Sequence, residues 1–248
     1  FLMNYGDLIG LLNGKVYVLK MSGKKEWIPG LGVIDTEKFR DYNYGDKINI
    51  LGLNFLIVKP TLEDILSNME RITQTIILKD MIYMIGKSGI SSSSKVAEIG
   101  VGSGFLTVGI LYYIRPSTLL GYDISEKNLM HVKNVLDWLG WIDYFKPYKI
   151  DNELNTNYNE FDAIFVDIPD PKIYLKDYYN SLKFNGRLIV FLPNITQVID
   201  FVRELKNFEF RKNSIYEIME REWIYGQREM RPLNTGILHT AFIIIVIK

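Results

Sequence analysis

Residues 95–104 read Lys-Val-Ala-Glu-Ile-Gly-Val-Gly-Ser-Gly. The apolar pattern of residues 95–99 predicts a short buried strand, and residues 104–114 have the composition of a helix. Three glycines at alternate positions between them let the backbone turn tightly and let a ligand approach the main chain. A glycine-rich turn that joins a strand to a helix is typical of cofactor-binding α/β folds.

The spacing of the glycines separates two kinds of cofactor. Dinucleotide-binding turns follow Gly-x-Gly-x-x-Gly, and here Phe105 stands where the third glycine would be. Glu98 precedes the turn, and its carboxylate suits a cationic ligand better than a pyrophosphate. The turn therefore predicts S-adenosyl-L-methionine, which carries a sulfonium and an ammonium group, as the cofactor.

Strands and helices alternate on the C-terminal side of this turn. We expect strands at residues 118–122, 161–166 and 187–192, and helices at residues 125–139, 175–182 and 196–205. Such alternation predicts a mostly parallel sheet covered by helices on both faces. Two further β-rich segments, 208–219 and 239–247, are expected to form an antiparallel edge pair joined by about 20 irregular residues. The predicted fold is α/β, with the Rossmann-like sheet of class I methyltransferases.

The N-terminal part of the chain has a different pattern. Residues 1–60 contain short apolar segments separated by turn signals such as Asn13-Gly14, which predicts a small β domain. We expect residues 61–94 to form a helical linker region, whose first helix begins with a capping box of Thr61 and Asp64. The domain that carries the methyltransferase fold is then expected to occupy residues 95–248.

Composition excludes several classes of site. The 248 residues contain no cysteine and two histidines, so thiolate zinc sites, iron–sulfur clusters and cysteine nucleophiles are excluded, and no metal is expected. No apolar run reaches the ~20 residues of a membrane span, and no export signal opens the sequence, so we expect a cytoplasmic protein. Lys plus Arg and Asp plus Glu both number 29, and this neutrality counts mildly against RNA binding unless a local patch concentrates positive charge.

Acidic residues stand at the carboxyl ends of three successive candidate strands, the third of which directly precedes Asp151. Beside Glu98, Asp123 stands where a carboxylate can accept hydrogen bonds from ribose hydroxyls, and Asp151 where it can accept one from an adenine amino group. The carboxyl ends of parallel strands form the binding crevice of open α/β sheets. The alternative for each is a helix N-cap, particularly for Asp123 with Ser125 after it.

A fourth carboxylate stands in the turn Val166-Asp-Ile-Pro-Asp-Pro171. The alternating prolines stiffen this turn, so Asp167 is expected to be held beside the reactive methyl group of the cofactor. A similar proline-containing loop occurs in methyltransferases of adenine nitrogens. A carboxylate there can orient the base and stabilise developing positive charge; the alternative is a turn aspartate without chemistry, as we expect for Asp170.

These motifs together resemble the tRNA (adenine-58, N1)-methyltransferase family, the TrmI-type enzymes of bacteria and archaea, over nearly the whole chain. Besides the glycine turn and the Asp167 loop, similar segments are Lys59-Pro-Thr-Leu-Glu-Asp64, Thr73-Gln-Thr-Ile76 with Lys79-Asp80, Leu192-Pro-Asn-Ile-Thr-Gln-Val198, Glu220-Arg-Glu-Trp223, Arg231-Pro232 and His239-Thr-Ala-Phe242. Their order and spacing carry the resemblance.

The resemblance implies a homotetramer that uses S-adenosyl-L-methionine to methylate N1 of adenine 58 in the T-loop of tRNA, and in archaeal members also position 57. Asp167 is then the catalytic carboxylate. The residues implied to line the cofactor are Gln74, Thr75, Glu98, Gly100, Gly102, Ser103, Gly104, Asp123 and Asp151. Those implied to contact the substrate are Asn194, Trp223 and Arg231, although Trp223 can equally be a core residue and Arg231 can pair with a carboxylate.

The chain departs from the family pattern at two places. Ile77 and Leu78 stand where the family often has an aromatic residue or histidine followed by proline, and Lys172 replaces the usual tryptophan after the catalytic loop. The first departure leaves open a non-catalytic RNA-binding paralogue subunit. A further alternative is a methyltransferase that acts on a protein carboxylate or a small molecule, against which the C-terminal motifs argue.

Overall fold

A computed structural model describes residues 3–151, 153–226, 230–233 and 239–248 of the chain. The chain divides into two compact units. The first consists of Phe1–Ile72 with Lys133–Asp143, and the second of Thr73–Val132 with Tyr144–Lys248.

The first unit contains the small antiparallel sheet that the turn signals indicate. Its strand order is β2-β1-β6-β5, and a separate hairpin, β3–β4, precedes a short 3-10 helix, Thr36–Phe39. The strands are β1 (Leu8–Asn13), β2 (Lys15–Lys20), β3 (Lys25–Ile28), β4 (Gly32–Asp35), β5 (Lys47–Ile50) and β6 (Leu53–Val58). Their inward side chains, among them Ile9, Leu11 and Phe55, form one core with Phe39.

Helix α1 (Leu62–Ser67) begins with the predicted capping box. The Thr61 amide donates to Asp64 Oδ2 at 2.8 Å, and the Asp64 amide donates to Thr61 Oγ1 at 3.2 Å. Two amides at the helix start are thereby satisfied, which is why this pair of residues marks the helix start in the sequence.

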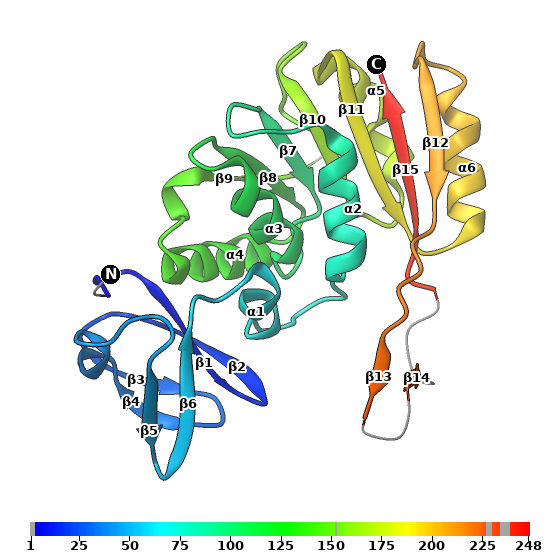
Figure 1. Cartoon of the computed structure of the whole chain (residues 1–248). Helices are drawn as coiled ribbons and strands as arrows, with labels where there is room; N and C mark the ends of the chain where they lie inside the picture. Colours follow the sequence, from blue (N-terminus) through cyan, green and yellow to red (C-terminus); the bar gives the residue numbers. More distant parts are fainter. Residues whose placement is uncertain (1–2, 152, 227–229, 234–238) are drawn as a thin grey trace. The chain divides into compact units, whose positions relative to one another are not determined.

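The second unit is built on a seven-stranded sheet of order β12-β15-β11-β10-β7-β8-β9 (Figure 1). The five strands from β11 to β9 are parallel, whereas β15 runs antiparallel to both β11 and β12. The strands are β7 (Val96–Ile99), β8 (Leu119–Asp123), β9 (Phe145–Lys149), β10 (Phe161–Val166), β11 (Leu182–Leu192), β12 (Lys212–Tyr216) and β15 (Phe242–Ile247). This confirms the predicted parallel sheet with an antiparallel C-terminal edge.

Helices connect and cover these strands. They are α2 (Leu78–Ser88), α3 (Phe105–Ile114), α4 (Glu126–Leu139), α5 (Leu175–Ser181) and α6 (Ile195–Leu205), with short 3-10 helices at Ile142–Tyr144 and Pro171–Tyr174. Helices α2 and α6 both contact β11 and β15, and in Figure 1 α6 lies next to β12, on the other side of these strands from α2. Because β7 pairs with β8 on one side and β10 on the other, the strand order reverses there, and the carboxyl end of β7 opens into the crevice of an α/β sheet.

Two elements differ from the expectation. Strand β11 begins at Leu182 instead of residue 187, because Leu182 already pairs with Phe161. The pairing register then shifts before Arg187 pairs with Ala163, and Asn185 in between adopts φ 65°. This start is irregular and partly polar, so it produces no strand pattern in the sequence. The segment expected to be irregular contains a hairpin of β13 (Trp223–Tyr225) and β14 (Met230–Pro232). Its strands are too short for a periodic pattern to reveal them.

None of the helices in the described part of the chain combines the length and the apolar composition that a membrane-spanning helix requires.

Candidate functional site

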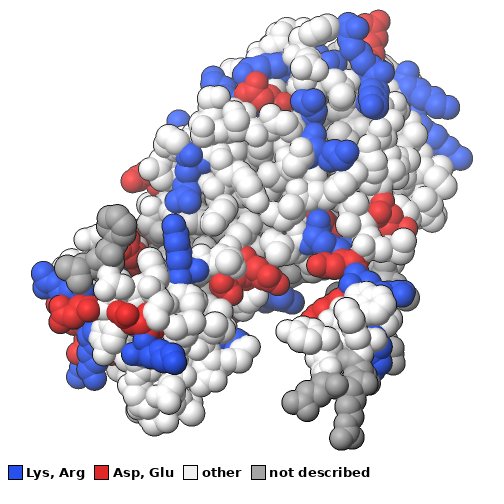
Figure 2. Space-filling model, viewed as in Figure 1, with Lys and Arg blue, Asp and Glu red and all other residues white. Residues whose placement is uncertain are grey.

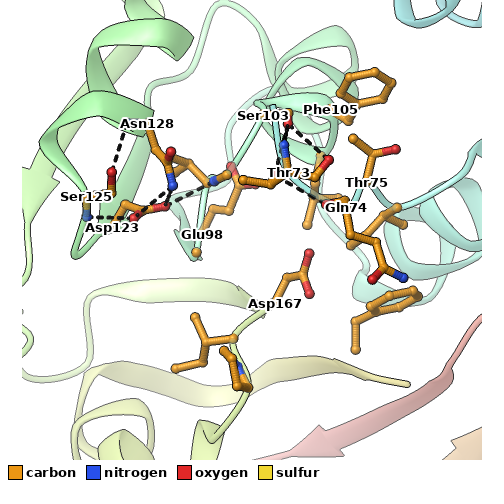
Figure 3. Close-up of a pocket in the computed structure, with 18 of the residues that line it drawn as sticks. Thr73, Gln74, Thr75, Glu98, Ser103, Phe105, Asp123, Ser125, Asn128 and Asp167 are labelled. Carbon is orange, nitrogen blue, oxygen red and sulfur yellow. Dashed lines mark hydrogen bonds between the residues drawn. The ribbon is translucent and has the colours of Figure 1, made fainter. Parts of the chain in front are cut away.

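A cavity of about 470 Å³ lies at the carboxyl ends of the central parallel strands (Figure 3). Five segments surround it: the glycine turn after β7, the end of β8, the loop after β10, the end of β11 with the start of α6, and the segment that leads into α2. Its lining residues include Thr73, Gln74, Thr75, Ile76, Glu98, Gly100, Gly102, Ser103, Asp123, Asn128, Asp167, Phe191, Pro193 and Gln197. Most of the predicted cofactor residues are therefore brought together.

Two glycines of the turn are required by close approach of other segments. Gly100 has φ 89°, and a Cβ atom there would lie 2.3 Å from the backbone oxygen of Asp167. Gly102 has φ 49°, and its Cβ would lie 2.8 Å from Thr73 Oγ1. Any larger residue would push the Asp167 loop or the Thr73 segment away. Gly104 is the N-cap residue of α3 and does not line the cavity.

The segment before α2 is held against the glycine turn by Ser103. The Thr73 amide donates to Ser103 Oγ at 2.8 Å, and the two hydroxyl oxygens are 2.9 Å apart. These bonds place Gln74 and Thr75 on the cavity wall. Thr73 is a residue that sequence reasoning did not select, although it adjoins the two that were.

Asp123 closes one side of the cavity at the end of β8. Its carboxylate accepts hydrogen bonds from the Gly102 amide at 3.1 Å and the Ser125 amide at 2.8 Å, and the Asn128 side-chain amide donates to both of its oxygens at 3.2 and 3.3 Å. The N-cap contact of α4 is made by Ser125, whose Oγ accepts a hydrogen bond from the Asn128 amide at 3.3 Å. Asp123 is therefore not the N-cap residue; it holds the loop before α4 and faces the cavity. Asn128, on the first turn of α4, was not predicted.

Glu98 is fully buried on β7 beneath the glycine turn. Thr107 of α3 donates to its Oε2 at 2.7 Å, while Oε1 has no hydrogen-bond partner among the described residues. Burial raises the pKa of this carboxyl well above its usual range; the nearby Asp167 and Asp123 raise it further, and the Thr107 hydroxyl opposes the shift. An orphaned acid oxygen at a cavity wall favours a donor or cationic group as its partner.

Asp167 follows β10 and points into the same cavity (Figure 3). Its amide donates to the Ile99 carbonyl at 2.9 Å, which fixes its backbone to the end of β7. No described residue donates a hydrogen bond to its carboxylate, and burial raises the pKa of this group to about 7. The carboxyl group of Asp167 is therefore poorly solvated, and its oxygens are available to a ligand. The hydrogen bond to Ile99 fixes the backbone of Asp167 and not its carboxylate.

Besides Gly104, four predicted site residues do not line the cavity. The Asp151 side chain is 79% exposed and lies 3.4 Å from Lys149 Nζ, because β9 is the outermost parallel strand and its end turns toward solvent. Asn194 precedes α6, next to the lining residue Pro193. Trp223 and Arg231 lie on the β13–β14 hairpin. Trp223 is 53% exposed, so the alternative of a core tryptophan is wrong.

His239 connects Glu217, which precedes the hairpin in the chain, to Pro193 on the cavity wall. Its Nδ1 lies 2.5 Å from Glu217 Oε1, and its Nε2 lies 2.9 Å from the carbonyl oxygen of Pro193. Both partners are acceptors, and a neutral imidazole carries only one N–H. The two hydrogen bonds, first that to Pro193 and then that to Glu217, therefore favour the imidazolium form and raise the pKa of His239.

A pH-dependent stability is expected from this histidine. Because its pKa is higher in the folded than in the unfolded chain, its contribution is fully present below the ordinary histidine pKa of ~6.5. The contribution is lost as the pH rises through the raised value. The melting temperature of His239→Gln should therefore fall furthest below that of the wild type at acidic pH, and the difference should shrink at pH 9. A difference that grows with pH would contradict the imidazolium.

Comparisons with known proteins identify the family of the chain. Residues 54–241 match the model of a family described as tRNA methyltransferase complex GCD14 subunit. The chain is 29% identical to the tRNA (adenine(57)-N(1)/adenine(58)-N(1))-methyltransferase TrmI of Methanocaldococcus jannaschii, with 94% of this chain and 91% of that protein aligned. It is 28% identical to the tRNA (adenine(58)-N(1))-methyltransferase TrmI of Thermus thermophilus, over 78% and 77% of the two chains.

Solved structures show the same fold. A SAM-dependent O-methyltransferase from Thermotoga maritima superposes with a TM-score of 0.84 at 23% identity, covering 99% of this chain and 94% of that one. The tRNA (m1A58) methyltransferase TrmI from Aquifex aeolicus gives 0.80 at 24% identity, covering 100% and 98%. The predicted class I methyltransferase sheet is thereby confirmed.

Proposed function

The chain belongs to the family of GCD14 subunits of the tRNA methyltransferase complex, and from this premise we propose that it transfers a methyl group from S-adenosyl-L-methionine to N1 of adenine 58 in tRNA. The relative from Methanocaldococcus jannaschii is named for positions 57 and 58, so the proposal extends to adenine 57. The observation that carries it is the Asp167 carboxylate, which faces the cavity without a hydrogen-bond donor from the described residues.

The chain's own residues fit this cofactor. Without a Cβ at Gly100 and Gly102, the Asp167 loop and the Thr73 segment can pack closely against the glycine turn, and all three line the cavity. The orphaned oxygen of Glu98 suits a cationic group, and the Asp123 carboxylate suits hydroxyl donors. We propose that these residues, with Gln74, Thr75 and Ser103, hold the cofactor. Asp151 would reach it only if the loop after β9 moved, since its side chain is now exposed.

When bound, S-adenosyl-L-methionine supplies a methyl group on a positively charged sulfur, and the transfer of that group to adenine N1 leaves a cationic base. Asp167 then acts in two ways. Its carboxylate accepts a hydrogen bond from the adenine N6 amino group, which orients N1, and its negative charge stabilises the positive charge that develops on the ring. No proton has to leave N1, so no general base is needed.

Aromatic residues around the cavity are candidates to contact the extruded base. Ile77 and Leu78, which depart from the family pattern, are the N-cap and first residue of α2, and Ile76 lines the cavity in their place. Phe191 at the end of β11 is an aromatic lining residue near the Asp167 loop. An aromatic face beside the target base contributes stacking of about 1–3 kcal/mol. The departure at Ile77 therefore does not remove every aromatic surface.

Local positive charge supports an RNA substrate despite the net neutrality. Figure 2 shows Lys and Arg side chains gathered on the second unit, over the upper ends of α2, β12 and β15, with few acidic side chains among them. Lys87 lies over the rings of Tyr83 and Tyr216, at 5.3 and 5.4 Å from their centroids. This patch lies at the end of the sheet opposite the cavity, because Lys87 is in the last turn of α2 whereas residues 73–76 before α2 line the cavity. It would therefore contact the phosphate backbone of tRNA away from the target base.

We also propose that the protein assembles as a homotetramer. Met219, Trp223, Tyr225 and Met230 on and near the β13–β14 hairpin are 53–86% exposed, and burial of such side chains between subunits would remove them from water. Sedimentation equilibrium should give four times the mass of the 28.9 kDa chain.

The reaction is tested with methyl-labelled S-adenosyl-L-methionine and unmodified tRNA. We expect label in N1-methyladenosine after digestion, and none when adenine 58 and adenine 57 are both replaced by guanine. Label in protein or in a small molecule would support the alternative acceptors. Bound RNA without any label would support a non-catalytic subunit and overturn the proposal.

The rate should depend on pH through Asp167. Because burial raises the pKa of Asp167 to about 7, we expect kcat/KM to rise about tenfold per pH unit below this value and to level above it. A bound cation favours the ionised form, so the inflection of kcat should lie at lower pH than that of kcat/KM. A profile that is flat between pH 5.5 and 8 would contradict the need for an ionised Asp167.

A further inference from the structure

We infer that Gln197 is a positioning residue that fixes the loop carrying Asp167, an inference that rests on the proposed function of that carboxylate. Gln197 lies on the first turn of α6 and lines the same cavity. Its Nε2 donates to the carbonyl oxygen of Pro169 at 2.8 Å.

The need for such a residue follows from the isolation of Asp167. Since no described residue donates a hydrogen bond to its carboxylate, the position of the backbone has a large part in setting the direction of this side chain. On the N-terminal side the backbone is fixed, because the Asp167 amide donates to Ile99 at 2.9 Å and the Asp167 carbonyl packs against Gly100.

The C-terminal side of the loop has few backbone donors. Pro169 and Pro171 lack an N–H, so neither residue can anchor this part of the loop by donating to a neighbouring strand. The Pro169 carbonyl can only accept, and Gln197 supplies the donor. The loop is thus held at both ends, by β7 on one side and by α6 on the other.

Gln197 is itself held in one orientation. Its Oε1 accepts a hydrogen bond from the Asn194 amide at 3.2 Å, and the neighbouring Val198 is buried in the core of the second unit. Only the amide orientation with oxygen toward Asn194 and nitrogen toward Pro169 satisfies both partners. A carboxylate of the same shape would keep the first bond and lose the second, which separates the positioning role from the capping of α6.

The test compares Gln197→Glu with wild type and with Thr196→Glu, which places the same charge on an exposed neighbour in the same turn. For Gln197→Glu we expect kcat to fall about 30-fold, since small displacements of a catalytic group cost up to ~100-fold. The dissociation constant of S-adenosyl-L-methionine should change less than about twofold, and Thr196→Glu should leave both values unchanged. As the pH falls and the new carboxyl gains a proton that it can donate to Pro169, the activity of Gln197→Glu relative to wild type should recover.

A readout without substrate keeps this inference separate from the proposed function. In the free protein, amide hydrogen exchange of residues 164–174 should be faster in Gln197→Glu than in wild type and unchanged in Thr196→Glu. Gln197→Met removes the donor without adding charge, so it should also lower kcat and speed the amide exchange of residues 164–174. This variant replaces Gln197→Glu as the test if Gln197→Glu does not fold. Unchanged exchange together with unchanged kcat would overturn the positioning role, whereas a wild type that does not methylate tRNA would overturn only the proposed function.

Discussion

Asp167→Asn should lower kcat for tRNA methylation about 10²–10³-fold, the range found when a preorganised electrostatic contact to a transition state is removed. Asparagine has the same shape and still accepts a hydrogen bond from an adenine amino group through its oxygen. It lacks the negative charge that opposes the positive charge developing on the base. The dissociation constant of S-adenosyl-L-methionine should change far less than kcat, because Glu98, Asp123 and the glycine turn remain.

The same substitution should stabilise the protein at alkaline pH, which provides an independent check. The pKa of Asp167 is raised from 3.8 to about 7, so the folded chain holds a proton that the unfolded chain has lost. Stability therefore falls as the pH rises from ~4 to ~7, by up to about 4 kcal/mol at ~1.4 kcal/mol per pKa unit. Asparagine cannot ionise and avoids this loss. Denaturant unfolding at pH 8.5 should show that Asp167→Asn is more stable than the wild type. A variant that is less stable, and whose affinity for S-adenosyl-L-methionine falls as much as its kcat, would contradict the role assigned to Asp167.

Gly100→Ala should strongly weaken both the binding of S-adenosyl-L-methionine and methyl transfer. The added Cβ would lie 2.3 Å from the Asp167 carbonyl oxygen and 2.7 Å from an Ile168 methyl group, at a residue with φ 89°. The first neighbour is backbone, so the turn or the Asp167 loop must shift, and the positive φ adds about 1–2 kcal/mol of strain. We expect the dissociation constant of S-adenosyl-L-methionine, measured by calorimetry, to rise at least about 100-fold, the size of effect that ~3 kcal/mol produces.

Gly86→Ala is the matched control for this substitution. Gly86 lies inside α2, and a Cβ there meets no atom within 4 Å. Alanine in a helix is favoured over glycine by about 1 kcal/mol, so this variant should melt slightly higher and bind the donor normally. If both alanine variants lost the same affinity for S-adenosyl-L-methionine, the close contact between Gly100 and the Asp167 loop would not be the reason that glycine is needed at residue 100.

The strand–turn–helix of residues 96–114 could be predicted because its signals are local. Apolar residues, glycines and a helix start follow one another in one short stretch, and each reports its own backbone geometry. Asp167 could be predicted for a similar reason, since it directly follows a buried strand whose carboxyl end must face the crevice. Glu98 and Asp123 follow from the same rule, and all three line the cavity.

Asp151 shows where this rule stops. It also follows a parallel strand, but β9 is the outer one of these strands, and the path of the loop beyond it leads the carboxylate to Lys149 and solvent. A periodic pattern in the sequence carries no information about the path of a loop. The β13–β14 hairpin and the irregular start of β11 escaped prediction because each is too short or too polar to produce a pattern.

The amino-acid sequence alone determined the class of fold, the cofactor turn and the acid that follows β10, because these depend on residues adjacent along the chain. Only the tertiary structure decided that Gly100 touches the Asp167 carbonyl, that Asn128 supports Asp123, and that Gln197 reaches Pro169 across 28 positions. Such contacts depend on how far each helix is rotated about its axis and where each loop crosses the sheet. These quantities are set by the packing of the whole core, and no short stretch of sequence specifies them.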